Sequence, residues 1–217
     1  MKNALKQFAD GVLAGLMIVI GCAVYLACES KVVGAVMFSV ALLTICYFGF
    51  SLFTGKVGFM VNGHSKTDFS VLFLGLLGNV VGTALFGYLL GLSNESLVEK
   101  AVLLCSGKLE QEFYQTLIRA VFCGVLMYVA VWVFKEKKSV SAILLCVPVF
   151  ILSGFEHSIA DMGFFAVTLT EFPVLESFAF ILIVIVGNSI GGMLIPFVLR
   201  LTCLKTKDSE EGTNAKS

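Results

Sequence analysis

The sequence predicts an all-α membrane protein with six transmembrane helices, built as two inverted three-helix repeats whose second and fifth helices are broken. Three observations predict this fold class. Hydrophobic residues make up 58% of the 217 residues and charged residues only 14%, with a mean hydropathy of +0.97, whereas a soluble domain carries about 25% charged residues. The apolar residues form long runs separated by short polar stretches, and one five-residue motif occurs in each half of the chain.

Six apolar runs are long enough to cross the hydrocarbon core of a bilayer, which takes about 20 residues. We expect them at 11–28, 32–53, 69–92, 117–134, 140–152 with a continuation to 169, and 175–204. Together they form a single transmembrane domain, 1–204, with repeats at about 5–92 and 112–204. The remaining residues, 205–217, are polar and are expected to form a solvated, poorly ordered cytoplasmic tail.

The first apolar run is interpreted as a membrane span and not as a cleaved signal peptide. It is longer than a typical signal-peptide core, and it contains no convincing cleavage site. Leu26-Ala27-Cys28 resembles a lipoprotein processing site only faintly, because Tyr25 does not fit that pattern.

The placement of basic residues predicts the orientation in the membrane. Basic groups precede the first span and follow the second, fourth and sixth spans: Lys2 and Lys6; His64 and Lys66; Lys135, Lys137 and Lys138; Lys205 and Lys207. With six spans, all four groups fall on one side, and the other side is richer in acidic residues. Both termini are therefore expected in the cytoplasm.

The internal repeat is carried by a G-N-x-x-G motif. Gly78-Asn79-Val80-Val81-Gly82 in the third span recurs 109 residues later as Gly187-Asn188-Ser189-Ile190-Gly191 in the sixth. Three spans per repeat make the second half enter the membrane from the opposite side, as in many transport proteins. The motif can also be a close-packing glycine face, and both interpretations can hold together.

Two spans are interrupted at corresponding places. Glycine-bearing polar stretches occur at 49–56 in the second span and at 153–158 in the fifth. Non-helical backbone at membrane depth is tolerated beside a cavity, so paired interruptions point to a binding site. Glu156 and His157 lie in the second interruption, and an ionisable residue at that depth is functional or neutralised by a partner. Alternatively, His157 packs against a backbone carbonyl, and Glu156 accepts backbone N–H groups freed by the break.

The second interruption also carries a recognisable motif. Residues 155–162, Phe-Glu-His-Ser-Ile-Ala-Asp-Met, resemble the F/Y-E-H-S-I-A-N-M motif of the formate/nitrite transporter family. Leu52-Phe53-Thr54-Gly55 is similar to the E-L-F-T-G loop of that family, and 123–132 is similar to its fourth span. The resemblance runs from about residue 14 to 192.

The resemblance implies an aquaporin-like protomer that forms a homopentamer in the bacterial inner membrane, surrounded by membrane lipid. Each protomer would pass a small monovalent anion such as formate, nitrite or hydrosulfide, or its protonated acid, and would hold no cofactor. The matching substrate-pathway positions are His157, Thr54, Leu52, Phe53, Phe150, Leu42 and Lys108. Supporting positions are Glu156, Asn79, Asn188, Lys56, Asp161 and Arg119.

The chain departs from the family pattern at four places. Gly124, Asp161 and Lys56 stand where asparagine is usual or frequent, and Ser51 replaces a glutamate. One hypothesis is that Lys56 and Asp161 form a charge pair; another is that they retune the pore.

The implied pathway suggests a mechanism. A bare anion would lose its hydration at high cost in crossing apolar constrictions, whereas a neutral acid would not. Lys108 and Arg119 can concentrate anions in a vestibule. His157 can then donate a proton, since imidazole titrates near working pH, with the Thr54 hydroxyl orienting the imidazole or the solute.

Other classes of function fit the sequence less well. A membrane enzyme would need more than His64 and His157, the two histidines, and no H-E-x-x-H motif is present. The seven cysteines include no C-x-x-C pair, which favours packing roles over a metal site. A water or glycerol channel would need two Asn-Pro-Ala motifs, and an ammonium channel a pair of pore histidines. The net charge of zero argues against a nucleic-acid partner.

Overall fold

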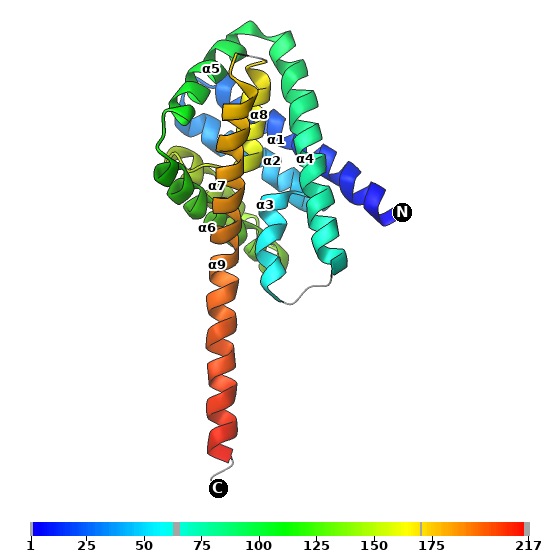
Figure 1. The fold of residues 1–217 in the computed structure, drawn as a ribbon, viewed down its shortest axis with the longest axis vertical. Helices are drawn as coiled ribbons and strands as arrows, with labels where there is room; N and C mark the ends of the chain where they lie inside the picture. Colours follow the sequence, from blue (N-terminus) through cyan, green and yellow to red (C-terminus); the bar gives the residue numbers. More distant parts are fainter. Residues whose placement is uncertain (1, 63–65, 170, 215–217) are drawn as a thin grey trace.

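The structure is a computed structural model that describes the backbone of residues 2–62, 66–169 and 171–214, and the side chains of 4–61, 68–169 and 171–202. In these ranges it is helical and contains no strand, which confirms the all-α fold class. The elements in Figure 1 are α1 (Lys2–Ala27), α2 (Lys31–Phe48), α3 (Phe53–Lys56), the 3-10 helix η1 (Val57–Asn62), α4 (Lys66–Ser93), α5 (Glu95–Leu109), α6 (Phe113–Lys137), α7 (Ser141–Leu152), α8 (Ser158–Val167) and α9 (Val174–Asn214).

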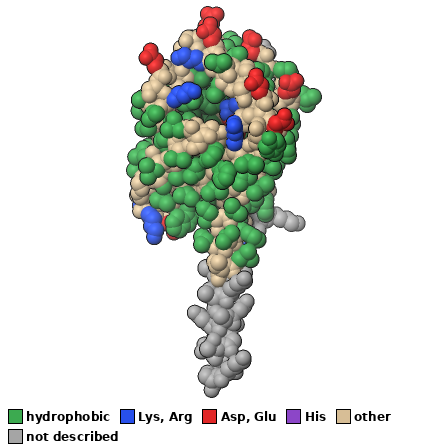
Figure 2. All heavy atoms as spheres, turned by 90° about the vertical axis from the view of Figure 1, so that its left-hand side faces the viewer, with side chains coloured by type: hydrophobic (Ala, Val, Ile, Leu, Met, Phe, Trp, Pro, Cys, Tyr) green, Lys and Arg blue, Asp and Glu red, His purple; other side chains and the backbone are tan. Residues whose placement is uncertain are grey.

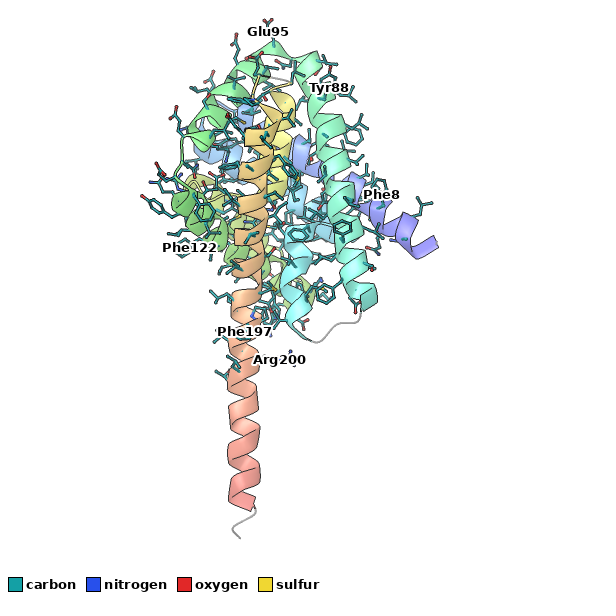
Figure 3. The ribbon with its side chains drawn as sticks, viewed as in Figure 1. Phe8, Tyr88, Glu95, Phe122, Phe197 and Arg200 are labelled. Atoms are coloured by element: carbon teal, nitrogen blue, oxygen red, sulfur yellow. The ribbon has the colours of Figure 1, made fainter. Side chains whose placement is uncertain are left out.

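Five helices are long and apolar enough to cross a membrane, namely the described parts of α1, α2, α4, α6 and α9. The shorter apolar helices α7 and α8 occupy the place of the expected fifth span. Bulky apolar side chains cover the outside of the bundle. Figure 3 shows Tyr88 and Phe122 pointing away from it, and they are 47% and 52% exposed. Such a surface is stable in contact with lipid.

Two features differ from the sequence prediction. Helix α5 was not predicted, because its charged residues keep it below the hydropathy of a membrane span. Helix α9 continues beyond 204 to Asn214, through a stretch expected to be irregular. Extending an existing helix avoids the cost of nucleation, and lysine and glutamate are good helix formers. The boundary at 204 between membrane domain and tail stays a prediction.

The glycines of the G-N-x-x-G motifs let pairs of helices approach closely. In the first half α4 packs on α1, where a Cβ at Gly78 would collide with the carbonyl oxygen of Phe8. In the second half α9 packs on α6, where a Cβ at Gly191 would collide with the carbonyl oxygen of Val121. The close-packing interpretation is therefore confirmed for both motifs.

The packing also explains one departure from the family pattern. A Cβ at Gly124 of α6 would overlap the carbonyl oxygen of Asn188. Gly15 of α1, which lies 109 residues earlier, makes the corresponding approach, and a Cβ there would lie 2.9 Å from the carbonyl oxygen of Asn79. Glycine at 124 thus permits the same helix contact in the second half as glycine at 15 permits in the first.

Both predicted interruptions are breaks between helices. Helix α2 ends at Phe48, the following residue Gly49 has a φ of 73°, and the chain is extended at Leu52 before α3 begins at Phe53. Helix α7 ends at Leu152, Gly154 has a φ of 65°, and α8 begins at Ser158. The left-handed conformation that glycine favours therefore redirects the chain in each break. The first break, 49–52, is shorter than the predicted 49–56 because the last four residues form α3.

Candidate functional site

Asn79 of α4 holds the first break in place. Its side-chain oxygen accepts a hydrogen bond from the backbone N–H of Phe53, 2.9 Å away. Its amide nitrogen donates to the carbonyl oxygens of Gly11, at 2.9 Å, and Ser51, at 2.8 Å. The side chain is fully buried, and one amide thus satisfies three backbone groups that water cannot reach.

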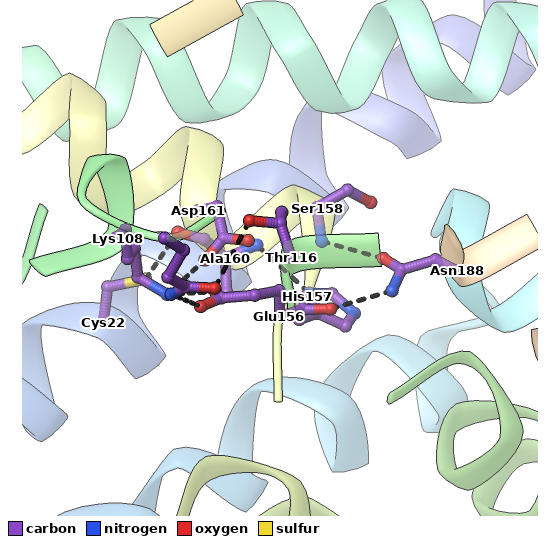
Figure 4. A network of polar contacts seen from close by, with 10 residues as sticks. Cys22, Lys108, Thr116, Glu156, His157, Ser158, Ala160, Asp161 and Asn188 are labelled. Carbon is purple, nitrogen blue, oxygen red and sulfur yellow. Dashed lines mark hydrogen bonds and ion pairs between the residues drawn. The ribbon is translucent and has the colours of Figure 1, made fainter. Parts of the chain in front are cut away.

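Asn188 of α9 does the same for the second break. Its oxygen accepts from the N–H of Ser158 at 2.8 Å, and its nitrogen donates to the carbonyl oxygens of Ala120 and Glu156, both at 2.8 Å. Figure 4 shows two of these bonds. The partners on the packed helices, Gly11 and Ala120, lie 109 residues apart in the sequence. The partners at the breaks, Ser51 with Glu156 and Phe53 with Ser158, lie 105 residues apart. The repeated motif had marked both asparagines, but this capping role was not predicted.

His157 is the N-cap residue of α8. Its Nδ1 accepts the backbone N–H of Ala160 at 3.1 Å, and its Nε2 lies 2.8 Å from Oγ1 of Thr54 in α3. Because Nδ1 accepts, these hydrogen bonds assign the ring proton to Nε2, which donates to Thr54. The ring also stacks on Phe150, with centroids 5.6 Å apart and planes at 18°. The alternative with a backbone carbonyl partner is therefore wrong, and the expected contact with Thr54 is present.

Two cavities lie along α2, one beside its first half and one beside its second half. The first, of about 580 Å³, is lined by residues that include Phe38, Phe150 and His157. The second, of about 240 Å³, is lined by residues that include Leu42 and Leu52. Phe38 of the first cavity and Leu42 of the second are four positions apart on α2, or about one helical turn, and the region between the two cavities is called the constriction below.

The predicted apolar residues are buried, and Phe150 lines the first cavity whereas Leu42 and Leu52 line the second. Leu52 is 1% exposed and Leu42 2%, whereas Phe150 is 3% and Phe53 7% exposed. Thr54 is also buried, at 1%. The contact between Thr54 and His157 joins α3 to the residue that caps α8. The sequence did not single out Phe38, which touches Phe150 edge-on with ring centroids 6.4 Å apart.

A charge cluster borders the first cavity. Nζ of Lys108, on α5, forms an ion pair with Oδ1 of Asp161 at 2.9 Å and a second one with Oε2 of Glu156. Figure 4 shows the lysine between the two carboxylates. Gln111 donates to the other oxygen of Glu156 at 2.7 Å. Glu156 is therefore bound by side chains, and the alternative that it accepts backbone N–H groups is wrong.

The two carboxylates determine the charge of Lys108. Burial opposes the charged ammonium, but the negative charges of Asp161 and Glu156 outweigh it and hold the pKa of Lys108 above its usual value. The side chains are 12% exposed for Lys108, 3% for Glu156 and 2% for Asp161. Lys108 therefore lines the cavity as a cation that already forms two ion pairs.

The hypothesis that Lys56 pairs with Asp161 is wrong. Lys56 donates to Oγ of Ser51 at 3.0 Å and to Oε1 of Gln7 at 3.5 Å, and it lines the second cavity. Asp161 lines the first cavity. The two residues occupy equivalent positions of the halves, 105 residues apart. An inverted repeat places such residues on opposite sides of the constriction.

Further cations surround the first cavity. Arg119, on α6, is half-buried in its wall, and Lys31 and Lys100 line it as well. Figure 2 shows lysine and arginine side chains around a hollow in this face. Within the described residues, the guanidinium of Arg119 forms no hydrogen bond or ion pair. Arg119 and Lys108 thus share one cavity, as predicted. Lys31 and Lys100 were not predicted to lie there, because Lys31 precedes a span and Lys100 lies in α5, which was not predicted.

The described side chains include no group of three or more His, Cys, Asp or Glu residues placed to hold a metal ion. The six cysteines among them are free thiols. The polar groups of the site are suited to binding, orientation and proton transfer.

The chain was compared with known proteins and structures. A sequence model of the family described as Formate/nitrite transporter matches residues 1–202. The formate channel FocA of Escherichia coli (strain K12) is 31% identical over 190 residues, or 74% of this chain and 65% of FocA, so the chain spans just under two thirds of that relative. The uncharacterized transporter YrhG of Bacillus subtilis (strain 168) is 27% identical over 196 residues, or 82% of this chain and 74% of YrhG.

Two solved structures share the fold. A pentameric formate channel with formate bound superposes with a TM-score of 0.79 at 21% identity, over 94% of this chain and 98% of that one. An FNT family ion channel superposes with a TM-score of 0.76 at 23% identity, over 92% of this chain and 89% of that one. These likenesses confirm the resemblance seen in the sequence.

Proposed function

Because the chain belongs to the formate/nitrite transporter family, we propose that this integral membrane protein conducts a small monovalent anion, or its protonated acid, through each protomer. Formate, nitrite and hydrosulfide are the candidate solutes, since each is small and conjugate to a weak acid. The observation that carries the proposal is the buried hydrogen bond between Thr54 and His157, because His157 lines the first cavity and Leu52, two residues before Thr54, lines the second. The relatives are named as channels and transporters rather than enzymes.

The constriction favours a neutral solute. Leu42, Leu52, Phe53 and Phe150 offer no hydrogen-bond donor to replace the hydration of an anion, and such a loss costs several kcal/mol or more. The cations of the first cavity raise the local concentration of anions. A proton supplied at the constriction then removes the charge before the apolar rings are crossed.

The hydrogen bonds define how His157 supplies that proton. In the assigned tautomer the neutral ring donates Nε2–H to Thr54, which leaves the Thr54 hydroxyl proton free for the solute. Transfer requires that Nδ1 first take up a proton, which removes the cap on Ala160. The Thr54 proton then passes to the anion, and the Nε2 proton replaces it on Oγ1. The ring resets when Nδ1 loses its proton and Nε2 regains one from water.

The assembly and location follow from the same family assignment. We propose a homopentamer, the state of the similar solved formate channel, in a bacterial inner membrane. The equivalent hydrogen bonds of Asn79 and Asn188 support two inverted three-helix repeats. The basic residues that flank the spans support cytoplasmic termini.

Proteoliposome flux assays test this function. Formate, nitrite and hydrosulfide are offered with and without a pH gradient, and at least one should cross faster at acidic pH. His157→Asn keeps an oxygen that can cap α8 but removes the titrating ring, so we expect it to fold and to lose the pH dependence. Unchanged flux and pH profile in this variant would show that His157 only packs.

Thr54 provides the second test in the same assay. Thr54→Val keeps the shape and removes the hydroxyl, and we expect flux to fall by about tenfold or more, which corresponds to about 1.4 kcal/mol. Thr54→Ser keeps the hydroxyl and is the matched control. Equal flux in the two variants would contradict a proton path through Thr54.

A further inference from the structure

We propose that Asp161 is a proton-binding site that controls whether Lys108 can bind an incoming anion. The inference rests on the proposed function, because the ligand that Lys108 would take is the conducted anion. It concerns a residue that departs from the family motif, where asparagine is usual. The cluster formed by Lys108, Glu156 and Asp161 is called the vestibule cluster below.

The first argument is a charge imbalance. The vestibule cluster holds one ammonium and two carboxylates, whose side chains are only 12%, 3% and 2% exposed. With both acids ionised, one negative charge is left without a counter-ion in a poorly hydrated place. Burying an unpaired charge is expensive, and such a group usually neutralises instead. Uptake of one proton makes the vestibule cluster neutral.

The second argument identifies the oxygen that takes the proton. Both oxygens of Glu156 have donors, Gln111 at Oε1 and Lys108 at Oε2. In Asp161, Oδ1 is paired with Lys108, but Oδ2 is buried and has no hydrogen-bond partner among the described residues. A buried carboxylate oxygen without a donor disfavours the ionised form. The proton therefore belongs on Asp161 and not on Glu156.

The surroundings of Asp161 supply no second counter-ion. Among the described residues, the charged and titratable groups near it are Lys108 and Cys105 from α5, Glu156 and His157 from the second break, Cys22 and Tyr25 from α1, and Cys123 and Arg119 from α6. Helices α4 and α9 pack on α8 through Gly87, Gly91 and Phe180. Arg119 lines the same cavity but forms no ion pair with Asp161 in the described structure.

The protonation state of Asp161 decides what Lys108 can do. When Asp161 is ionised, two carboxylates occupy the ammonium, and the excess negative charge repels an anion in the first cavity. When Asp161 is protonated, Lys108 keeps Glu156 as its partner and can turn one N–H donor to the cavity that it lines. Acid on this side of the membrane thus creates the anion site and supplies the proton that the solute needs.

The substitution Asp161→Asn tests the proposal, because asparagine has the same shape and cannot ionise. In oriented proteoliposomes, formate uptake from the first-cavity side should increase by about tenfold at neutral pH, because Lys108 loses one of its two ion pairs. A tenfold change corresponds to about 1.4 kcal/mol. In Asp161→Asn, the increase of uptake at acidic pH should be smaller than in wild type, because only the contribution of His157 remains. Glu99→Gln, at an exposed carboxylate of α5, is the matched control and should behave as wild type. An unchanged pH profile in Asp161→Asn would overturn the proposal.

A second measurement does not depend on transport. Infrared difference spectroscopy of the purified protein between acidic and alkaline pH should show the carbonyl band of a protonated carboxyl group, and Asp161→Asn should lack it. If the band persists in that variant, Asp161 is not the proton site. If the band is absent in the variant but no candidate anion crosses the wild-type protein, the proton site stands and the proposed function fails.

Discussion

The two helix breaks have the same scaffold and opposite chemistry. Asn79 and Asn188 make the same three hydrogen bonds, one to the first N–H of the new helix and two to carbonyl oxygens. At equivalent positions 105 residues apart, however, the first break and α3 carry Ser51, Leu52 and Lys56, and the second break and α8 carry Glu156, His157 and Asp161. Every scaffold bond goes to backbone, so the side chains of a break can diverge without loss of the fold.

The divergence assigns a different role to each break. Leu52 caps α3 with no side-chain hydrogen bond and lines the second cavity as an apolar wall. Its equivalent, His157, caps α8 through Nδ1 and supplies the titratable group. Lys56 lines the second cavity together with Lys135, whereas Asp161 lines the first as an acid paired with Lys108. Two breaks with the same backbone hydrogen bonds therefore stand beside two cavities whose linings differ in their titratable groups.

The largest expected effect comes from removing an asparagine of the scaffold. Asn188→Ala and Asn79→Ala each leave three buried backbone groups without a partner, at about 1–3 kcal/mol per group. Both variants should lose several kcal/mol of stability, by similar amounts, as measured by thermal unfolding in detergent. Ser189→Ala, next to Asn188, removes one hydrogen bond within α9 and is the control. A large loss in one variant and none in the other would contradict the equivalence of the two breaks.

The sequence predicted the breaks because glycine and polar residues inside an apolar span interrupt both its hydropathy and its helix propensity. It could not predict the partners of Asn79 and Asn188, since a hydrogen bond to backbone depends on helix packing and leaves no pattern in residue type. The pairing of Lys56 with Asp161 was predicted from opposite charge alone. In the structure the two residues line different cavities, and the partner of Asp161, Lys108, lies on a helix whose hydropathy gave no signal.

A smaller effect should follow from removing the charge that distinguishes the second cavity. Lys56→Asn removes one of the two cations, with Lys135, that line it. Anion uptake from the second-cavity side should fall about threefold to tenfold at low salt, since one charge a few ångströms away contributes about 1 kcal/mol in water. Uptake from the first-cavity side should change less.

The salt dependence sharpens this test, because screening weakens the field of an exposed charge at high ionic strength. The difference between Lys56→Asn and wild type should therefore shrink as salt is added. Lys137→Gln is the matched control, because Lys137 is an exposed lysine in the last turn of α6, close in sequence to Lys135. Equal loss of uptake from both sides, or an unchanged ranking of formate, nitrite and hydrosulfide, would count against a role of Lys56 in tuning the pore.

The smallest effect concerns the glycines that begin the two breaks. Gly49 and Gly154 have φ values of 73° and 65°, and a Cβ at either would meet no atom within 4 Å. Replacement by alanine therefore adds only backbone strain, about 1 kcal/mol at each site. Gly49→Ala and Gly154→Ala should lower the free energy of unfolding equally, and the double variant should show the sum, because separate sites add. A loss of several kcal/mol at one glycine alone would mean that its break is held by packing that the other lacks.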